Sequence, residues 1–269
     1  MSIIITGDTH IPITASRILE IGDSGMEKDK NFLIICGDFG LLWLKIPDKV
    51  ECEWIELLNK QPFITLFVDG NHENHDRLAS LPVEHKFGSL VGKISDSIYH
   101  LKRGNIYTIE NKTFLAVGGA FSVDAWHFEE YPISHKPKLV WDRKPGKTWW
   151  PTEEISKEEE LLAMNNLRDH NMSVDYIISH TCPDEIAKQY LMTQKPRFSD
   201  PGFLGKKSRK NEAFLSEVVK CTNFKRLFFG HWHDDWSTYD YKDGIKRYYH
   251  MLYYDIKDIS MLEQQDIAE

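Results

Sequence analysis

The chain has 269 residues, of which 41% are hydrophobic and 12% aromatic, and its formal net charge is -8 at pH 7. This hydrophobic content is ample for one well-packed core, so we expect a single domain that spans residues 1-269. The acidic balance argues against nucleic acid as a partner, although it does not exclude a local basic patch.

Six short apolar runs, rich in β-branched and aromatic residues, predict strands. Each run is followed by a glycine or a polar cluster, and its unbroken hydrophobic character predicts burial on both faces of a sheet. The predicted strands cover residues 3–6, 32–36, 63–68, 114–117, 176–179 and 227–229.

Helical patterns lie between several of these runs, over residues 14–21, 50–60, 152–170 and 211–220. In the third pattern, Thr152 stands at the predicted start, and Glu153 and Glu154 place acidic side chains in the first turn. The alternation of strand and helix predicts an α/β layered fold. In such folds, functional groups gather at the carboxyl ends of the strands.

The alternation loosens after residue 120. We expect an aromatic-rich insertion at about 120-175 and a second loop at about 183-210. Tryptophans in the insertion favour a second small core under a long loop, and the alternative is a cap that supplies substrate contacts. These tryptophans are Trp126, Trp141, Trp149 and Trp150.

No export or membrane signal is visible. Ile3-Ile4-Ile5 begins a strand almost directly after Met1, without the basic and apolar regions of a signal peptide. The apolar runs stay far below the roughly 18 residues that cross a bilayer. We therefore expect a cytoplasmic protein with no membrane partner, whereas its oligomeric state is not predicted by the sequence.

The cysteines are scattered and form no CxxC pair, which is typical of reduced thiols. Two of them, Cys36 and Cys182, lie beside the motifs described next. We interpret both as small core residues in preference to metal ligands. The four cysteines are Cys36, Cys52, Cys182 and Cys221.

Five short motifs follow predicted strands, and each brings oxygen or imidazole donors. Taken singly, each is also typical of a polar turn, with Asp8 as a turn residue and His10 as a surface histidine. The His-x-His run after the last strand is the most specific. The motifs are Gly7-Asp8-Thr9-His10, Gly37-Asp38, Gly70-Asn71-His72-Glu73, Ser179-His180 and Gly230-His231-Trp232-His233.

The complete set of donors carries more weight than any one motif, because independent turns rarely coincide at so many strand ends. Carboxylate and amide oxygens mixed with imidazoles suit Mn, Fe, Zn or Co. The donors also exceed what one metal ion needs. Two ions that share a bridging carboxylate are therefore implied.

In this order, the motifs resemble those of the calcineurin-like metallophosphoesterase superfamily, over residues 7–233. The resemblance implies a four-layered α/β/β/α sandwich with two central mixed β-sheets and a metal site at the carboxyl ends of the strands. It also implies that Asp38 bridges two metal ions. One ion would be held by Asp8, His10 and His233, and the other by Asn71, His180 and His231.

The same resemblance makes His72 a catalytic acid and not a ligand. Two cations roughly 3.5 to 4 Å apart can each bind a phosphate oxygen and activate a water to hydroxide, which attacks phosphorus in line. His72 can protonate the leaving alkoxide. The expected function is metal-dependent hydrolysis of phosphate mono- or diesters, by a phosphatase or phosphodiesterase whose phosphoester substrate is unassigned.

Departures from the superfamily pattern indicate which branch of the superfamily the chain resembles. Residues 39–43 lack the Asp-Arg-Gly run that supplies a phosphate-gripping arginine in the phosphoprotein phosphatase branch, so that branch is disfavoured. Gly118-Gly119-Ala120 and Trp149-Trp150 look instead like an unassigned bacterial and phage branch. We interpret the two glycines as points of close backbone approach.

Three charged residues could contact substrate, although each is more typical of a solvated or paired surface charge: Arg103, Asp124 and Arg143. Two alternative functions stay open. A nuclease of the same superfamily would share the ligands, and the acidic net charge disfavours it. A non-catalytic, metal-stapled binding or regulatory protein would keep the ligands without turnover, and the intact His72 disfavours it.

Overall fold

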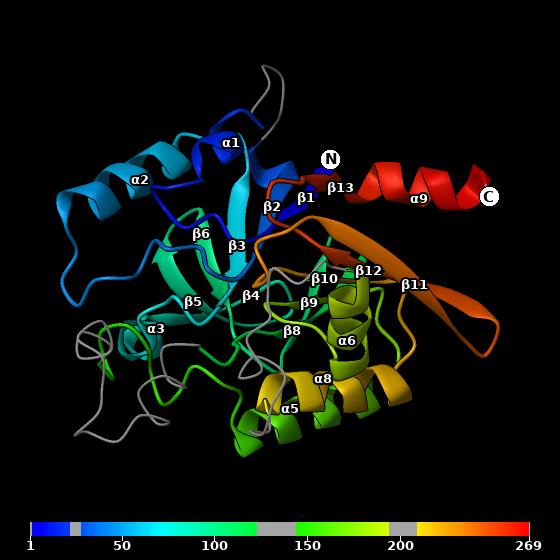
Figure 1. Ribbon diagram of the computed structural model, residues 1–269. Coiled ribbons are helices and arrows are strands. Elements are labelled where there is room, and N and C mark those ends of the chain that lie inside the picture. The colour runs from blue at the N-terminus through cyan, green and yellow to red at the C-terminus, as the bar shows by residue number, and fades with distance from the viewer. Residues whose placement is uncertain (1, 22–27, 123–143, 194–208, 269) are drawn as a thin grey trace, which may run out of the picture.

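Two β-sheets pack against each other in the computed structural model, which describes residues 2–21, 28–122, 144–193 and 209–268 (Figure 1). The first sheet has the spatial order β13 (Lys257–Asp258), β1 (Ser2–Thr6), β2 (Asn31–Cys36), β3 (Ile64–Val68), β6 (Ile98–Leu101), β5 (Ser89–Ser95) and β4 (Val83–Lys86). The second has the order β11 (Trp236–Lys242), β12 (Ile245–Met251), β10 (Arg226–Phe229), β9 (Tyr176–Ser179), β8 (Lys112–Val117) and β7 (Ile106–Ile109).

Both sheets are mixed, as predicted. Strands β1, β2, β3 and β6 run parallel in the first sheet, and β12, β10, β9 and β8 run parallel in the second. The remaining strands pair antiparallel toward the edges. The parallel strands that precede the motifs therefore release the chain at one edge of each sheet.

Helices cover the outer faces of the sheets (Figure 1). The first sheet carries α1 (Ser16–Leu19) and α2 (Lys49–Asn59), and the second carries α5 (Lys157–Asp169), α6 (Asp184–Thr193) and α8 (Lys210–Cys221). Shorter or peripheral helices are η1 (Lys28–Lys30), α3 (His75–Ser80) and α9 (Ile259–Ala268). No described helix is both long and apolar enough to span a membrane.

Alternating side chains along the strands divide the apolar residues among three clusters. In β1, Ile5 enters the cluster between the sheets, whereas Ile4 enters the cluster beneath α1 and α2. In β10, Phe228 joins the central cluster and Phe229 packs beneath α5, α6 and α8. Because successive strand residues point to opposite faces, both faces of these runs are buried. The predicted four-layered α/β/β/α sandwich is confirmed.

All six predicted strands are present, and their ends shift by at most two residues. The helices predicted at 50–60 and 211–220 are α2 and α8. The helix predicted at 14–21 shortens to α1, because the Thr14 hydroxyl donates to the backbone oxygens of Asp8 and Thr9 and holds residue 14 in the preceding loop. Local sequence patterns thus locate the central layers well.

The predicted start of the third helix at Thr152 is wrong, since α5 begins at Lys157. Ser156 is the N-cap and forms a capping box with Glu159. The carboxylate of Glu153 instead accepts hydrogen bonds from the backbone N–H groups of Ser122 and Trp150. These two hydrogen bonds, one local and one to a residue 31 positions away, hold Glu153 outside the helix.

The stretch predicted as a second loop at 183-210 contains helix α6, and residues 194–208 of it lie outside the described residues. Three of its residues, Ile186, Ala187 and Tyr190, are buried in the cluster beneath the second sheet, which explains why the segment is helical. The aromatic-rich insertion at 120-175 stays a prediction, because Trp126 and Trp141 also lie outside the described residues.

Candidate metal centre

The five motifs meet at the carboxyl ends of parallel strands from both sheets. Asp8 and His10 follow β1, Asp38 follows β2, and Asn71 follows β3. His180 follows β9 of the second sheet, and the last histidine pair follows β10. All seven residues predicted as ligands lie in two neighbouring groups.

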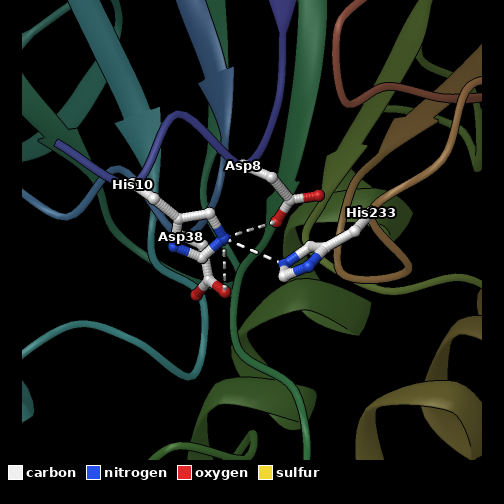
Figure 2. A group of neighbouring side chains, drawn as sticks. All are labelled: Asp8, His10, Asp38 and His233. Atoms are coloured by element: carbon white, nitrogen blue, oxygen red, sulfur yellow. Dashed lines mark hydrogen bonds and ion pairs between the residues drawn. The ribbon is translucent and has the colours of Figure 1, made fainter. Parts of the chain in front are cut away.

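The first group consists of Asp8, His10, Asp38 and His233, which point toward one another in Figure 2. One donor atom from each lies within 4.8 Å of the others. Nε2 of His10 lies 2.9 Å from Nε2 of His233, 3.8 Å from Oδ2 of Asp38 and 4.0 Å from Oδ1 of Asp8. Such a set of converging donors could hold one metal ion.

The second group lies on the other side of Asp38. Nε2 of His180 is 3.2 Å from Oδ1 of Asn71 and 3.3 Å from Oδ1 of Asp38. The rings of His180 and His231 have their centroids 5.0 Å apart. Nδ1 of His180 faces the carbonyl oxygen of Cys36 at 2.9 Å, which orients Nε2 toward the group. Asp38 thus turns one carboxylate oxygen toward each group.

Asp8 provides a test of whether these residues fit a metal ion. Both of its carboxylate oxygens are buried, and neither accepts a hydrogen bond of ordinary geometry from the part of the chain that the structure describes. A buried carboxylate that accepts no hydrogen bond of ordinary geometry is costly unless a cation binds it. Together with the imidazoles and the Asn71 amide, this donor set suits Mn, Fe or Zn.

Five of the seven residues have a left-handed backbone conformation, which non-glycine residues rarely adopt. Each such residue costs of order 1–3 kcal/mol and persists only where its surroundings impose it. The concentration of this strain at one place indicates that the loops are shaped for function. The φ angles are 47° for Asp8, 40° for His10, 48° for Asp38, 73° for His231 and 51° for His233.

Steric crowding explains why glycine precedes several of the donor residues. A Cβ on Gly70 would overlap Oδ1 of Asp38, and one on Gly230 would lie 2.5 Å from Oδ2 of Asp8. A Cβ on Gly37 would overlap the ring of His180. Each loop therefore passes so close to a donor from another loop that no side chain fits between them.

Burial and neighbouring charges perturb the titration of the group. Burial raises the pKa of Asp8 well above its ordinary value. Burial also opposes ionisation of Asp38, but the imidazoles of His180 and His72 outweigh it and lower the Asp38 pKa. For His180, burial disfavours the charged ring, yet the Asp38 and Asp8 carboxylates raise its pKa to about 10. A bound cation and the proton on Nε2 of His180 would therefore compete.

The pKa values of the three other imidazoles in the two groups are lowered. Burial lowers the pKa of His10 to about 4 and also lowers the pKa values of His231 and His233. These three rings are neutral at pH 7 and keep a lone pair available for a metal ion.

His72 lies at the edge of the first group and is partly exposed. Its backbone N–H donates to Oδ1 of Asp38 at 2.8 Å, and its ring centroid is 5.7 Å from that of His10. The indole of Trp43 is a further neighbour of the His72 ring, at 5.3 Å from centroid to centroid. The sequence did not single out Trp43, because its only signal there was a position in the run that follows Asp38.

Asp69 and Arg103 are buried supports behind the β3 loop, and the sequence did not predict this pairing. Arg103 is 7% exposed and donates to Asp69 and to the backbone oxygens of Glu153 and Glu154. The interpretation of Arg103 as a surface charge is therefore wrong. Asp69 stands directly before Gly70 of the third motif, but nothing in the sequence links it to Arg103. Asp124 and Arg143 lie outside the described residues.

Smaller predictions near the site are confirmed. A Cβ on Gly118 would lie 2.5 Å from Oδ1 of Asp69, and one on Gly119 would overlap the Glu153 backbone oxygen, so both glycines permit close backbone approach. Cys36 and Cys182 are fully buried members of the apolar clusters.

Comparison with known proteins gives one family match. Residues 1–235 match the family model described as calcineurin-like phosphoesterase. The lariat debranching enzyme of Schizosaccharomyces pombe is 26% identical over 191 residues, which make up 64% of this chain and 37% of that enzyme. The chain thus spans little more than a third of that relative's length. A solved phosphopantetheinyl hydrolase from Mycobacterium tuberculosis aligns with a TM-score of 0.47 and 12% identity, over 94% of this chain and 89% of that one.

Proposed function

The chain belongs to the calcineurin-like phosphoesterase family, and on this basis we propose that it hydrolyses phosphate mono- or diesters with two bound metal ions. The observation that carries the proposal is the position of Asp38, whose two carboxylate oxygens face different donor groups at 3.8 Å from His10 and 3.3 Å from His180. A single carboxylate that faces two donor groups suits a pair of ions that lie close together.

Each of the two donor groups would bind one metal ion, and Asp38 would be shared between the two ions. When bound, the ions would offset the charge of the phosphate oxygens and lower the pKa of a bound water. The chain itself contributes the fixed geometry of the donors, because strained loops and tight glycine contacts hold them in place. One ion would be held by Asp8, His10 and His233, and the other by Asn71, His180 and His231.

His72 is the proposed catalytic acid. It lies beside His10 and is partly exposed, so its ring is open to a substrate that occupies the first group. Its backbone is fixed by the hydrogen bond to Asp38. From this position its imidazolium can give a proton to the leaving oxygen.

Two lines of support bear on the ester class. The relative named as a lariat debranching enzyme favours a phosphodiester over a monoester. Residues 39–43 contain no arginine, and Phe39, Leu41 and Leu42 are buried in the core, which disfavours the phosphoprotein phosphatase reaction.

The test uses protein loaded with Mn and assayed with p-nitrophenyl phosphate and its bis ester. We expect hydrolysis of at least one of them, metal analysis near two ions per chain, and loss of nearly all activity in Asp38→Asn. The matched control is His85→Ala, an exposed histidine on edge strand β4, which should behave as the unaltered protein. Complete inactivity with both ions bound, across chromogenic and nucleotide substrates, would sink the proposal.

A nuclease is the second candidate, and the debranching relative is the observation that favours it. A nuclease should bind labelled single or double strands in a salt-dependent way, and no binding at low salt removes this candidate. His72→Ala distinguishes both enzymes from a metal-stapled binding protein. An enzyme should lose about 100-fold or more of its turnover while it keeps its metal, whereas a pure binder should change little.

A further inference from the structure

An indole ring lies beside the proposed catalytic acid. The ring centroids of Trp43 and His72 are 5.3 Å apart, with an angle of 41° between the ring planes. On another side, Trp43 meets the buried ring of Trp150 edge to face at 5.5 Å. Trp43 itself is partly exposed. An aromatic surface is therefore available to solvent next to the place where a leaving group would receive its proton.

Residues at the start of α3 donate hydrogen bonds to the backbone carbonyl oxygens of Trp43 and of its two chain neighbours. The carbonyl oxygen of Leu42 accepts from the Asn74 backbone N–H at 2.8 Å, and the Asn74 side-chain amide donates to the Trp43 carbonyl. The Arg77 guanidinium donates to the Leu44 carbonyl at 3.0 Å. The indole is thus positioned before any ligand arrives, so little conformational entropy is lost on contact with a planar ring.

The geometry points to a base-stacking subsite at Trp43. This subsite would bind the nucleobase of a nucleotide phosphoester whose leaving oxygen is protonated by His72. This inference rests on the proposed function, because it uses the position assigned to the leaving group. Every nucleobase has a flat π face, and stacking on an aromatic side chain tightens binding by about 5- to 150-fold per base. The subsite therefore selects nucleotide esters over esters of simple alcohols without selecting one base.

A phenolic ester is the other planar ligand to consider. Its ring is attached directly to the leaving oxygen, and this oxygen must lie within reach of the His72 imidazole. A nucleobase is separated from the ester oxygen by a sugar. It can therefore contact the Trp43 ring, whose centroid is 5.3 Å from that of His72, while the ester oxygen stays at the imidazole.

Binding of non-hydrolysable ligands tests the subsite without relying on turnover. The probes are the phosphonate analogues of adenosine monophosphate and of ribose 5-phosphate, measured by calorimetry with Mn-loaded protein. We expect the adenosine analogue to bind about 10-fold tighter, which corresponds to about 1.4 kcal/mol and lies at the lower end of a stacking contact. Trp43→Leu should abolish this preference and leave the affinity for the ribose analogue unchanged, and Trp43→Phe should keep most of it.

The control is Trp54→Leu on α2, a partly buried tryptophan on the outer face of the first sheet, which should leave both affinities unchanged. Equal affinities in the unaltered protein, or equal weakening of both ligands by Trp43→Leu, would overturn the subsite and assign Trp43 a packing role. The same Trp43 dependence for phenylphosphonate would overturn the nucleotide assignment. Failure of the proposed function looks different, because the protein would then hydrolyse no ester with both ions bound, whatever residue stands at position 43.

Discussion

Two nitrogens of Arg103 donate to the same oxygen of Asp69. Nε lies 2.8 Å from Oδ2 of Asp69, and Nη2 lies 2.5 Å from it. The other oxygen of Asp69 lies 2.9 Å from Nε2 of His100. Burial opposes ionisation of Asp69, but Arg103 and His100 hold its pKa far below the usual range. Arg103 also donates to the backbone before α5. The pair therefore links the loop that follows β3, which carries Asn71, to the backbone that precedes α5.

Removal of Arg103 should destabilise the fold strongly. Arg103→Ala leaves the buried Asp69 carboxylate without its main partner, and breaking such a pair costs about 3–5 kcal/mol of the free energy of unfolding. Urea denaturation measures this loss. Lys93→Ala, which removes the partner of the exposed Asp96, is the control and should leave the urea midpoint almost unchanged.

A second substitution separates the charge effect from lost packing. Asp69→Asn in the Arg103→Ala background removes the unpaired charge, so the double variant should recover part of the stability lost by Arg103→Ala. Strict additivity of the two single losses would contradict the view that these two residues act as a pair.

The strand ends and the donors could be predicted because their signals are local. Each central strand is an apolar run, and each donor stands within a few residues of its end. The Asp69 and Arg103 pair left no such signal, since the partners are 34 residues apart and an arginine is typical of a surface charge. Burial of that charge depends on two sheets that come together only in the folded chain.

The helix start at residue 157 illustrates a second limit. Two patterns compete there, one that begins at Thr152 and one that pairs Ser156 with Glu159. Local propensity supports both. The choice is made by Glu153, whose carboxylate is occupied by the Ser122 and Trp150 backbone N–H groups. Edge strands such as β11 were missed for a related reason, because its polar and aromatic residues acquire a register only through pairing with β12.

Gly70→Ala should weaken metal binding. The φ of Gly70 is outside the left-handed region, so alanine can adopt its backbone conformation. Its Cβ would nevertheless overlap Oδ1 of Asp38 and lie 2.5 Å from the Asp38 backbone nitrogen, so the carboxylate and the loop that carries it must both shift. We expect the affinity for Mn, measured by calorimetry, to fall about 10-fold or more, as for other displaced metal-site partners.

The control for this change is Gly244→Ala in the turn between β11 and β12. Gly244 has a φ of 80°, and among the described residues, its two chain neighbours apart, no atom lies within 4 Å of the place that an alanine methyl group would take. Alanine there adds backbone strain of about 1–2 kcal/mol without touching the site. Its Mn affinity should equal that of the unaltered protein. Unchanged Mn affinity in Gly70→Ala would contradict the close contact between the two loops.

Metal removal should expose the cost of burying Asp8. Chelation is expected to lower the melting temperature, and Mn at 100 times its Kd should restore about 2.7 kcal/mol. Asp8→Asn should raise the stability of the chelated protein, because it removes a buried carboxylate that accepts no hydrogen bond of ordinary geometry from the described residues. The same variant should lose most of the stabilisation by Mn.

Scanning calorimetry with EDTA and with Mn measures both effects. Asp96→Asn alters an exposed carboxylate and should leave the Mn response intact. If Asp8→Asn lowers the stability of the chelated protein and keeps the full response to Mn, then Asp8 is a structural residue and not a ligand.

Glu212 should make stability depend on pH. Its Oε1 accepts from the Thr181 hydroxyl at 3.0 Å, whereas its Oε2 is buried without a hydrogen-bond partner in the described parts of the chain. Burial raises its pKa from 4.5 to about 7. Between these values the folded chain keeps a proton that the unfolded chain has released. The stabilising contribution is therefore complete below pH 4.5 and is lost as the pH rises through 7.

Glu212→Gln removes this proton and keeps an oxygen for Thr181. The free energy of unfolding of the variant should therefore rise relative to the unaltered protein between about pH 5 and pH 7, by at most about 1.4 kcal/mol per pH unit, and then level off. Urea denaturation at several pH values from about 5 to 8 measures the difference. Glu217→Gln, an exposed position on the same helix, should change stability by less than about 0.5 kcal/mol throughout. A difference for Glu212→Gln that stays constant over this range would mean that the buried carboxyl does not titrate within it.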